Sequence, residues 1–170
     1  LLDDIATVPC GAYEKVAIAL SEPLVDDPAK RFAKIDPGAP ERLIDFQIVP
    51  GPQPMMIAHL GGSRAREMVR EGPEARMALA RERLGQAFGA QAEAAILGMA
   101  TTDWLTDPLV RGAYSASLPG EGRRRHAMIA AETGPIAFAG EAFSRQWQAT
   151  AHGAYQSGRD VAARVAGALR

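Results

Sequence analysis

The pattern of apolar and polar positions in the amino-terminal third predicts three strands. Residues 13–20 carry β-branched, aromatic and small apolar side chains in partial alternation, which is typical of a strand with one buried face. Residues 43–49 and 55–60 have the same character, and the proline-rich turn at 50–54 between them favours a hairpin. Residues 21–40 combine several prolines with charges, so we expect a long surface loop there.

Helical periodicity begins after the Gly61-Gly62 break. Ser63 is a candidate N-cap for a short helix ending at Glu71, and Pro73 suits the first turn of a second helix ending near Gly89. An apolar stripe predicts that the second helix packs through one face; it consists of Met77, Ala80, Leu84, Ala87 and Phe88. Residues 94–101 predict a buried strand, although the small apolar residues at its start are also compatible with a helical turn.

Glycines divide the final third into short apolar pieces, as expected where backbone approaches a ligand closely. Residues 136–139 predict a buried strand that runs into Gly140 and Glu141. Residues 150–169 predict a long helix with one entire face buried, most simply against a sheet. The arginines at 123–125 predict a solvated turn, with a carboxylate or phosphate contact as the alternative.

Composition and charge exclude several classes of partner. The 170 residues are 47% hydrophobic, and 19 basic residues against 20 acidic ones leave a net charge of -1. The chain therefore has no basic surplus for nucleic acid or anionic lipid, and no apolar run reaches the ~20 residues of a membrane span. We expect a cytoplasmic protein with no nucleic-acid or membrane partner. The chain begins at Leu1 rather than methionine, which suggests a fragment or a processed piece.

The common self-contained catalytic and metal-binding signatures are missing from the sequence. It contains no GxGxxG, Walker A, HExxH, CxxC or GxSxG motif. Its single cysteine, Cys10, excludes an intramolecular disulfide, and with only three histidines we expect no metal site. Any activity must therefore depend on a more dispersed pattern.

A set of short segments in a fixed order supplies such a pattern. Its members are Asp103-Trp104, Gly112-Ala113-Tyr114-Ser115, Pro119-Gly120, Phe138-Ala139-Gly140-Glu141, Trp147 and the HGAYQSG run at 152–158. Together they resemble the carboxy-terminal part of the flavin-containing amine oxidases, a family that includes monoamine, polyamine and amino-acid oxidases. The resemblance covers nearly all of the chain.

The resemblance implies an α+β fold made from parts of two domains. Residues 1–110 would be the end of a substrate-binding domain, with a mixed sheet and helices. Residues 111–170 would supply the closing strand and helix of an FAD-binding α/β domain. The family's amino-terminal βαβ unit, which binds the ADP part of FAD through GxGxxG, has no counterpart here. We therefore expect the isolated chain to be inactive and to expose apolar surface, which the missing amino-terminal portion or a homo-oligomer would cover.

The resemblance also implies an FAD site. Its cofactor-binding residues would be Gly140, Glu141, Trp147, Ala149, Thr150 and Gly153. The Glu141 carboxylate would accept hydrogen bonds from the ribityl chain, and the helix that starts near Thr150 would direct N–H groups at the flavin. Ala113 stands where some family members carry a cysteine bonded to the flavin, so the FAD would be noncovalent.

The implied reaction is the oxidation of an amine. Tyr114 and Trp104 would be the catalytic aromatic residues beside flavin N5, where hydride arrives from the amine carbon and O2 later takes the electrons to give H2O2. Thr150 replaces the second aromatic wall of the family, so the identity of the amine stays open. A related flavin desaturase or protoporphyrinogen-type oxidase is one alternative, and a non-catalytic assembly module is another.

Overall fold

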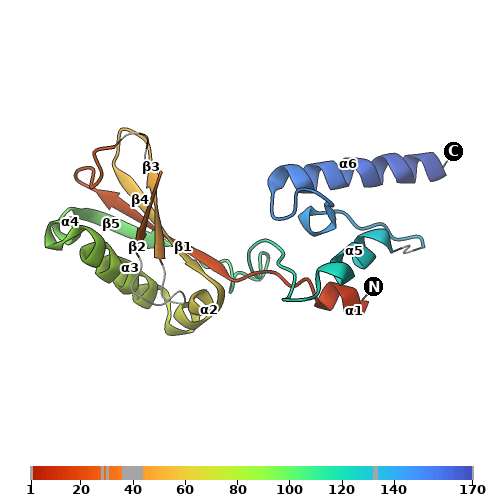
Figure 1. Ribbon diagram of the computed structural model, residues 1–170, viewed down its shortest axis with the longest axis horizontal. Coiled ribbons are helices and arrows are strands. Elements are labelled where there is room, and N and C mark those ends of the chain that lie inside the picture. Colours follow the sequence, from red (N-terminus) through yellow and green to blue (C-terminus); the bar gives the residue numbers. More distant parts are fainter. Residues whose placement is uncertain (1, 28, 30, 36–43, 132–133, 170) are drawn as a thin grey trace. The chain divides into compact units, whose positions relative to one another are not determined.

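The chain divides into two compact units (Figure 1). A computed structural model describes residues 2–27, 29, 31–35, 44–131 and 134–169. The first unit, here called the sheet unit, spans residues 12–113, and the second, the helical unit, combines residues 1–11 with 114–170. The chain therefore passes between the units twice, before Ala12 and after Ala113. The assignment of these parts to substrate-binding and FAD-binding domains stays a prediction.

The sheet unit contains a five-stranded sheet in the order β2-β3-β4-β1-β5. The strands are β1 (Tyr13–Leu20), β2 (Phe32–Ile35), β3 (Ile44–Val49), β4 (Met55–Gly61) and β5 (Ile96–Thr101). The α+β class is confirmed, but every described strand pair is antiparallel, so the predicted mixed sheet is wrong. The short proline turn between β3 and β4 joins antiparallel neighbours directly, whereas a parallel pair would need a long crossover.

Most predicted boundaries in this unit are confirmed. The strands at 13–20 and 55–60 are in place, and β3 agrees with the prediction from Ile44 onward. The loop prediction for 21–40 is wrong at β2, which contains no proline and pairs with β3. Residues 28, 30 and 36–43, which include parts of that loop and Leu43, lie outside the described residues.

Helices cover one face of the sheet. They are α2 (Gly62–Glu71), α3 (Pro73–Phe88) and α4 (Ala90–Ala94), and α4 occupies the start of the segment predicted as a strand from residue 94. Gly61, rather than Ser63, is the N-cap of α2. The buried core joins alternate strand residues to the apolar faces of these helices; it includes Val16, Ile18, Phe46, Ala58, Leu60, Met68, Ala80 and Leu84. The opposite face of the sheet carries the other alternate residues, which are half-buried.

The helical unit contains α1 (Leu2–Ala6), α5 (Gly122–Ala130), the 3-10 turn η2 (Glu141–Phe143) and α6 (Ala151–Ala168). Its two chain segments are tied together by backbone hydrogen bonds. The N–H of Gly11 donates to the Tyr114 carbonyl at 2.8 Å, and the N–H of Ala116 donates to the Pro9 carbonyl at 2.9 Å. This antiparallel pairing holds the segment that follows Tyr114 beside the amino-terminal segment.

Three predictions for the helical unit are wrong. Residues 136–139 form no strand in the described structure, because a strand needs a neighbouring strand to complete its hydrogen bonds. Within α6 only Gly153 and Ser157 are buried, instead of an entire face. The arginines at 123–125 lie in α5, and Arg125 is buried rather than solvated.

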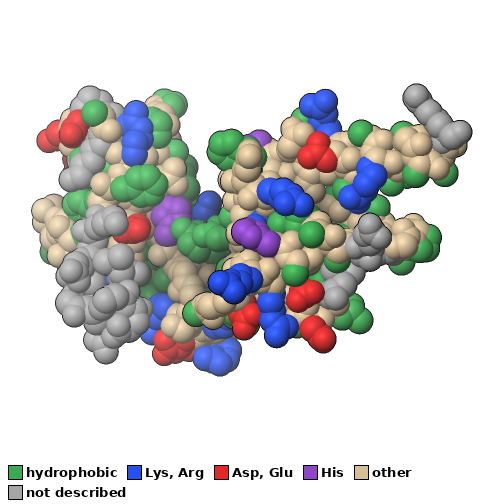
Figure 2. All heavy atoms as spheres, turned by 45° about the vertical axis from the view of Figure 1, so that its right-hand side comes forward, with side chains coloured by type: hydrophobic (Ala, Val, Ile, Leu, Met, Phe, Trp, Pro, Cys, Tyr) green, Lys and Arg blue, Asp and Glu red, His purple; other side chains and the backbone are tan. Residues whose placement is uncertain are grey.

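The predicted exposed apolar surface is confirmed. Large hydrophobic side chains stand in solvent on the segment before Gly140 and along α6; they are Ile136, Phe138, Tyr155, Val165 and Leu169. Figure 2 shows hydrophobic side chains at the molecular surface between the charged ones. No helix in the described part of the chain has the length and apolar character needed to cross a membrane.

Candidate functional site

The Glu141 carboxylate joins three segments of the helical unit. Its Oε1 accepts a hydrogen bond from the Ser115 N–H at 2.8 Å. Its Oε2 accepts from the Ser115 hydroxyl at 2.9 Å and from the Ala149 N–H at 2.6 Å. A carboxylate has about four acceptor positions, so one position on Oε1 remains available to a ligand hydroxyl.

The backbone at Ala149 is shaped to serve this carboxylate. Ala149 has a φ of 63°, a left-handed conformation that is uncommon for alanine. Its neighbour Gln148 donates from Nε2 to the Ser115 carbonyl at 3.1 Å and lies 3.2 Å from the Ser115 hydroxyl. Outliers of this kind persist only where surrounding contacts hold them, and here the contacts fix the loop that leads into α6.

The start of α6 is closely packed on that loop. The Thr150 hydroxyl accepts from the Gly153 N–H at 3.1 Å and donates to the Trp147 carbonyl at 2.6 Å. A Cβ atom on Gly153 would lie 1.9 Å from the same carbonyl oxygen, so only glycine fits. The N–H groups of Ala151 and His152 have no partner within the described residues, as expected in the first turn of a helix. They provide hydrogen-bond donors and the positive end of the helix dipole for a ligand.

Arg125 supports this arrangement from α5. Its Nη2 donates to the Ser144 carbonyl, just after the 3-10 turn that carries Glu141. Burial lowers the pKa of the Arg125 guanidinium, and the negative charge of Glu141 opposes that shift. The guanidinium remains charged at any ordinary pH, so it also offsets the charge of Glu141.

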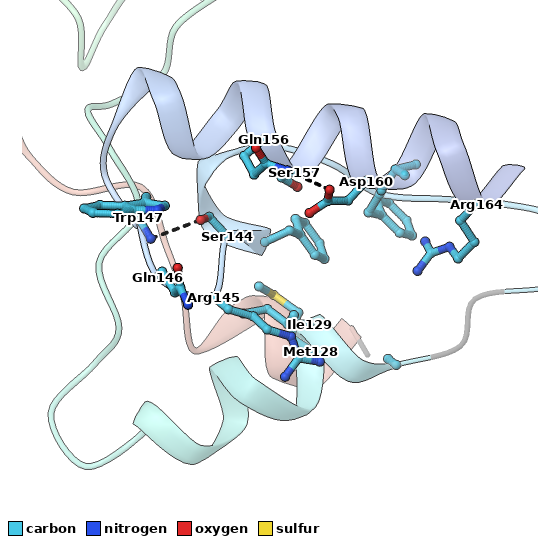
Figure 3. A pocket seen from close by; sticks show the side chains of 14 residues that line it. Met128, Ile129, Ser144, Arg145, Gln146, Trp147, Gln156, Ser157, Asp160 and Arg164 are labelled. Carbon is cyan, nitrogen blue, oxygen red and sulfur yellow. Dashed lines mark hydrogen bonds between the residues drawn. The ribbon is translucent and has the colours of Figure 1, made fainter. Parts of the chain in front are cut away.

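A hollow of about 550 Å³ lies beside these residues (Figure 3). Met128 and Ile129 of α5 form one side, and Gln156, Asp160 and Arg164 of α6 form the other. The loop from Ser144 to Trp147 closes one end. The lining also includes the exposed Phe138, so the hollow is continuous with the exposed apolar surface.

In the sheet unit, two buried charged side chains hold the segment that carries Trp104. Glu14 of β1 is fully buried, and its carboxylate accepts from the Thr102 hydroxyl, from the Trp104 N–H at 3.3 Å and from the Leu105 N–H at 2.9 Å. Arg76 of α3, also fully buried, donates to the Thr101 hydroxyl at 3.0 Å and forms an ion pair with Asp103.

A row of ionisable side chains crosses the face of the same sheet that lies opposite the helices. Lys15 of β1 is the cross-strand partner of His59 of β4, which in turn is the partner of Asp45 of β3. The Lys15 ammonium lies 5.5 Å from the centre of the Trp104 ring, in a cation-π contact. The Tyr13 hydroxyl lies 2.8 Å from His59 Nδ1.

The His59 ring is expected to titrate below the usual histidine range. Burial lowers its pKa from 6.5, Lys15 lowers it further, and Asp45 opposes both. Relative to the wild type, Lys15→Met should therefore raise the pKa of His59, whereas Asp45→Asn should lower it. Titration of the His59 ring protons by NMR in the three proteins checks these directions. Equal titration curves would contradict the proposed electrostatic coupling.

The same shift gives stability a pH dependence. Because the pKa of His59 is lower in the folded state than its ordinary value of 6.5, the unfolded state takes up a proton first as the pH falls. The contribution of neutral His59 to the free energy of unfolding is thus present above pH 6.5 and is lost below it.

The structure brings together six of the predicted site residues within the helical unit, namely Gly140, Glu141, Trp147, Ala149, Thr150 and Gly153. Tyr114, which is 49% exposed, directly precedes Ser115 in this unit, whereas Trp104 belongs to the sheet unit, so their pairing at one site stays a prediction. Their cofactor-binding and catalytic roles also stay predictions. The described residues contain no group of acidic, histidine or cysteine side chains arranged to hold a metal ion.

Ser115, Gln148 and Arg125 also hold this site together, and none of them was predicted as a site residue. Ser115 follows Tyr114 within a recognised segment, so its position was a signal, but its partner Glu141 lies far along the chain. Arg125 belongs to the arginine run at 123–125, for which a carboxylate or phosphate contact was the alternative, but its hydrogen bond goes to the backbone carbonyl of Ser144. Gln148 gave no signal, because its hydrogen bond to the Ser115 carbonyl depends on the folded loop.

Comparisons with known proteins give consistent matches. A family model described as flavin containing amine oxidoreductase matches residues 2–166. Cyclohexylamine oxidase from Brevibacterium oxydans IH-35A is 25% identical with a TM-score of 0.76, covering 96% of this chain and 37% of that one. A wild-type putrescine oxidase bound to putrescine is 20% identical with a TM-score of 0.80, covering 98% and 37%. No curated protein sequence matches the chain. The chain thus spans about 37% of the length of these solved relatives.

Proposed function

Because the chain belongs to the flavin containing amine oxidoreductase family, we propose that it forms the carboxy-terminal part of an FAD-dependent amine oxidase. The observation that carries the proposal is the joining of Glu141, the αL turn at Ala149 and the glycine-dependent start of α6 in one hydrogen-bonded unit. In the described structure, this group of residues offers one unused acceptor position on Glu141 Oε1 and the unpaired N–H groups of Ala151 and His152. Hydroxyl groups and an electron-accepting ring edge are the ligand groups that such a pair suits.

The residues of the helical unit fit an FAD molecule as follows. Glu141 would accept from a ribityl hydroxyl through Oε1, and the N–H groups of Ala151 and His152 would face the part of the ring that becomes negative on reduction. Ala113 has no nucleophilic side chain, so the cofactor would be held without a covalent bond. When bound, FAD would accept a hydride from the amine carbon and deliver the electrons to O2.

Trp104 and Tyr114 would border the amine and exclude water from it. Lys15, whose ammonium lies on the Trp104 ring, would then donate hydrogen bonds at the same end of the site. Glu14 and Arg76 would not contact the amine themselves. They would position Trp104, because they hold the segment that carries it.

The exposed apolar side chains point to a further structural partner. We propose that the remainder of the oxidase packs on the hollow between α5 and α6 and supplies the strand that would pair with residues 136–139. Phe138 and Val161 line that hollow, and α6 has few buried residues of its own. Burial of such a surface would add stability that the isolated chain lacks.

Glu141→Gln should weaken both the loop and the cofactor site. The amide places an NH2 group against either the Ser115 N–H or the Ala149 N–H, so at least one backbone donor loses its acceptor at a cost of about 1–3 kcal/mol. We expect flavin occupancy to fall at least tenfold. Flavin absorbance per protein, measured after removal of free FAD, checks this. Glu121→Gln is the matched control, because Glu121 pairs with Arg124 at the surface and should change little; equal occupancy in both variants would contradict the role of Glu141.

Peroxide formation tests the proposed activity. The gene product that contains this chain, supplied with FAD, should form H2O2 in the presence of a primary amine and none without it. Bound flavin without amine-dependent peroxide would favour the desaturase-type alternative. Neither bound flavin nor peroxide would favour a non-catalytic module.

A further inference from the structure

The Thr102 hydroxyl takes the place of a backbone carbonyl at the point where β5 ends. In the register of β1 and β5, Val16 pairs with Thr101, so Lys15 lies opposite Thr102. The N–H of Thr102 donates to the Lys15 carbonyl at 3.0 Å, as in an ordinary antiparallel pair. The N–H of Lys15 completes the pair through Thr102 Oγ1, at 2.9 Å, rather than through a carbonyl oxygen. This exchange of a side-chain oxygen for a backbone oxygen lets the chain leave the sheet after Thr102.

Three hydrogen bonds in series connect the backbone of Lys15 with that of Trp104. The first is the bond from the Lys15 N–H to the Thr102 hydroxyl. In the second, the same hydroxyl donates to Glu14 Oε2, and in the third this oxygen accepts from the Trp104 N–H at 3.3 Å. Glu14 is fully buried, and hydrogen bonds in series strengthen one another where water is excluded. Thr102 is the member that joins Lys15 to the other two residues.

The series bears on where the Lys15 side chain lies relative to the Trp104 ring. Both residues are half-buried, and the Lys15 ammonium lies 5.5 Å from the ring centre. A lysine side chain is a flexible four-carbon stem, so this contact persists only where the two backbones are held at a fixed distance. The Lys15 backbone is fixed by β1. Trp104 lies beyond the end of β5, so its distance from Lys15 depends on the hydrogen bonds that leave the sheet.

We infer that Thr102 is a positioning residue, whose hydroxyl fixes the Lys15 ammonium on the Trp104 ring. Without the hydroxyl, the Lys15 N–H loses its acceptor and Glu14 loses a donor. The catalytic meaning of this inference rests on the proposed function, which places the reacting amine beside Trp104. Misplacement of a group at a reaction centre by about 1 Å lowers a rate by about 100-fold, so Thr102 should affect the rate without contacting the amine.

The sheet unit should stay folded when this hydroxyl is removed. Thr102 is half-buried, and valine has nearly the shape of threonine. Arg76 also holds the segment through its ion pair with Asp103, and this pair does not involve the hydroxyl. Thr102→Val should therefore move Trp104 relative to Lys15 rather than unfold the unit.

NMR spectra of the 170-residue chain test the positioning without any reaction. The Lys15 ε-methylene group is bonded to an ammonium that lies over the Trp104 ring, so the ring current shifts its protons upfield. Trp104→Leu, which removes the ring, defines the unshifted position. The upfield shift should fall by at least half in Thr102→Val and return in Thr102→Ser, which keeps a hydroxyl. Thr106→Val is the control, because Thr106 is exposed and its hydroxyl donates to the Asp103 carbonyl.

Three results would overturn the inference. The first is a Lys15 shift that is equal in Thr102→Val and wild type. The second is a shift that is lost in Thr102→Ser as well, since the hydroxyl would then not be the group responsible. The third is a wild-type Lys15 signal at the position found in Trp104→Leu, and this measurement decides even if Thr102→Val does not fold.

Kinetics of the FAD-loaded gene product separate this inference from the proposed function. We expect kcat/KM for an amine to fall at least tenfold in Thr102→Val and to stay near the wild-type value in Thr102→Ser and Thr106→Val. If Thr102→Val oxidises amines as fast as wild type, the oxidase stands and the inference is wrong. If Thr102→Val moves the Lys15 signals but the wild type forms no peroxide, the positioning stands and the oxidase is wrong.

Discussion

Glu14→Ala should destabilise the sheet unit by about 4 kcal/mol. The change leaves three donors without an acceptor, namely the N–H groups of Trp104 and Leu105 and the Thr102 hydroxyl, each at about 1–3 kcal/mol. It also opens a cavity, because Glu14 is fully buried. The Trp104 segment should then lose its fixed position on Lys15.

Fluorescence of Trp104 during denaturant unfolding measures this loss. The protein has two tryptophans, one in each unit, so a Trp147→Phe background leaves Trp104 as the single tryptophan, which is excited selectively at a wavelength that tyrosine does not absorb. Glu22→Ala is the control, since Glu22 is exposed and such substitutions stay within about 0.5 kcal/mol. Equal unfolding midpoints for the two alanine variants would show that Glu14 does not hold the segment.

Gly153→Ala should disrupt the start of α6 and cost the helical unit about 3 kcal/mol or more. The new Cβ would lie 1.9 Å from the Trp147 carbonyl oxygen, and this atom is backbone, so the whole loop must move. The movement separates Thr150 from Trp147 and shifts Ala149 away from Glu141. We therefore expect loss of bound flavin as well as of stability.

Gly158→Ala provides a matched control on the same helix. Apart from the neighbouring backbone of α6 itself, no described atom lies within 4 Å of a Cβ built on Gly158, and alanine is favoured over glycine inside a helix by about 1 kcal/mol. Unfolding followed through Trp147, in a Trp104→Phe background, should show loss of stability in Gly153→Ala and a small gain in Gly158→Ala. If both substitutions left the midpoint unchanged, the close contact at Gly153 would be refuted.

Local patterns sufficed where one segment determines its own structure. The alternation in residues 13–20 identified β1, and the periodicity of residues 150–169 identified α6, whose N-cap is Thr150. The predictions failed where structure depends on a distant partner. Residues 136–139 have the apolar character of a strand but have no strand beside them in the described structure. Strand β2 lies in a proline-rich segment and depends on its pairing with β3.

The candidate site shows the same division. Glu141, Gly153 and Thr150 were identified from their motif and lie together in the structure. Ser115 and Arg125 bind that group across long sequence separations, which no local pattern records. Asp45 and His59 are neighbours because of the register between β3 and β4. The sequence predicts the two strands but does not determine that register.

Acid release of flavin tests the central claim most directly. The gene product that contains this chain is incubated with FAD, freed of excess cofactor and precipitated with acid, and absorbance is recorded before precipitation and in the supernatant. We predict a flavin spectrum on the protein, complete release of that flavin into the supernatant, and no bound flavin in Gly153→Ala. Protein that retains no flavin, or flavin that stays in the precipitate, would contradict a noncovalent site built from Glu141 and the start of α6.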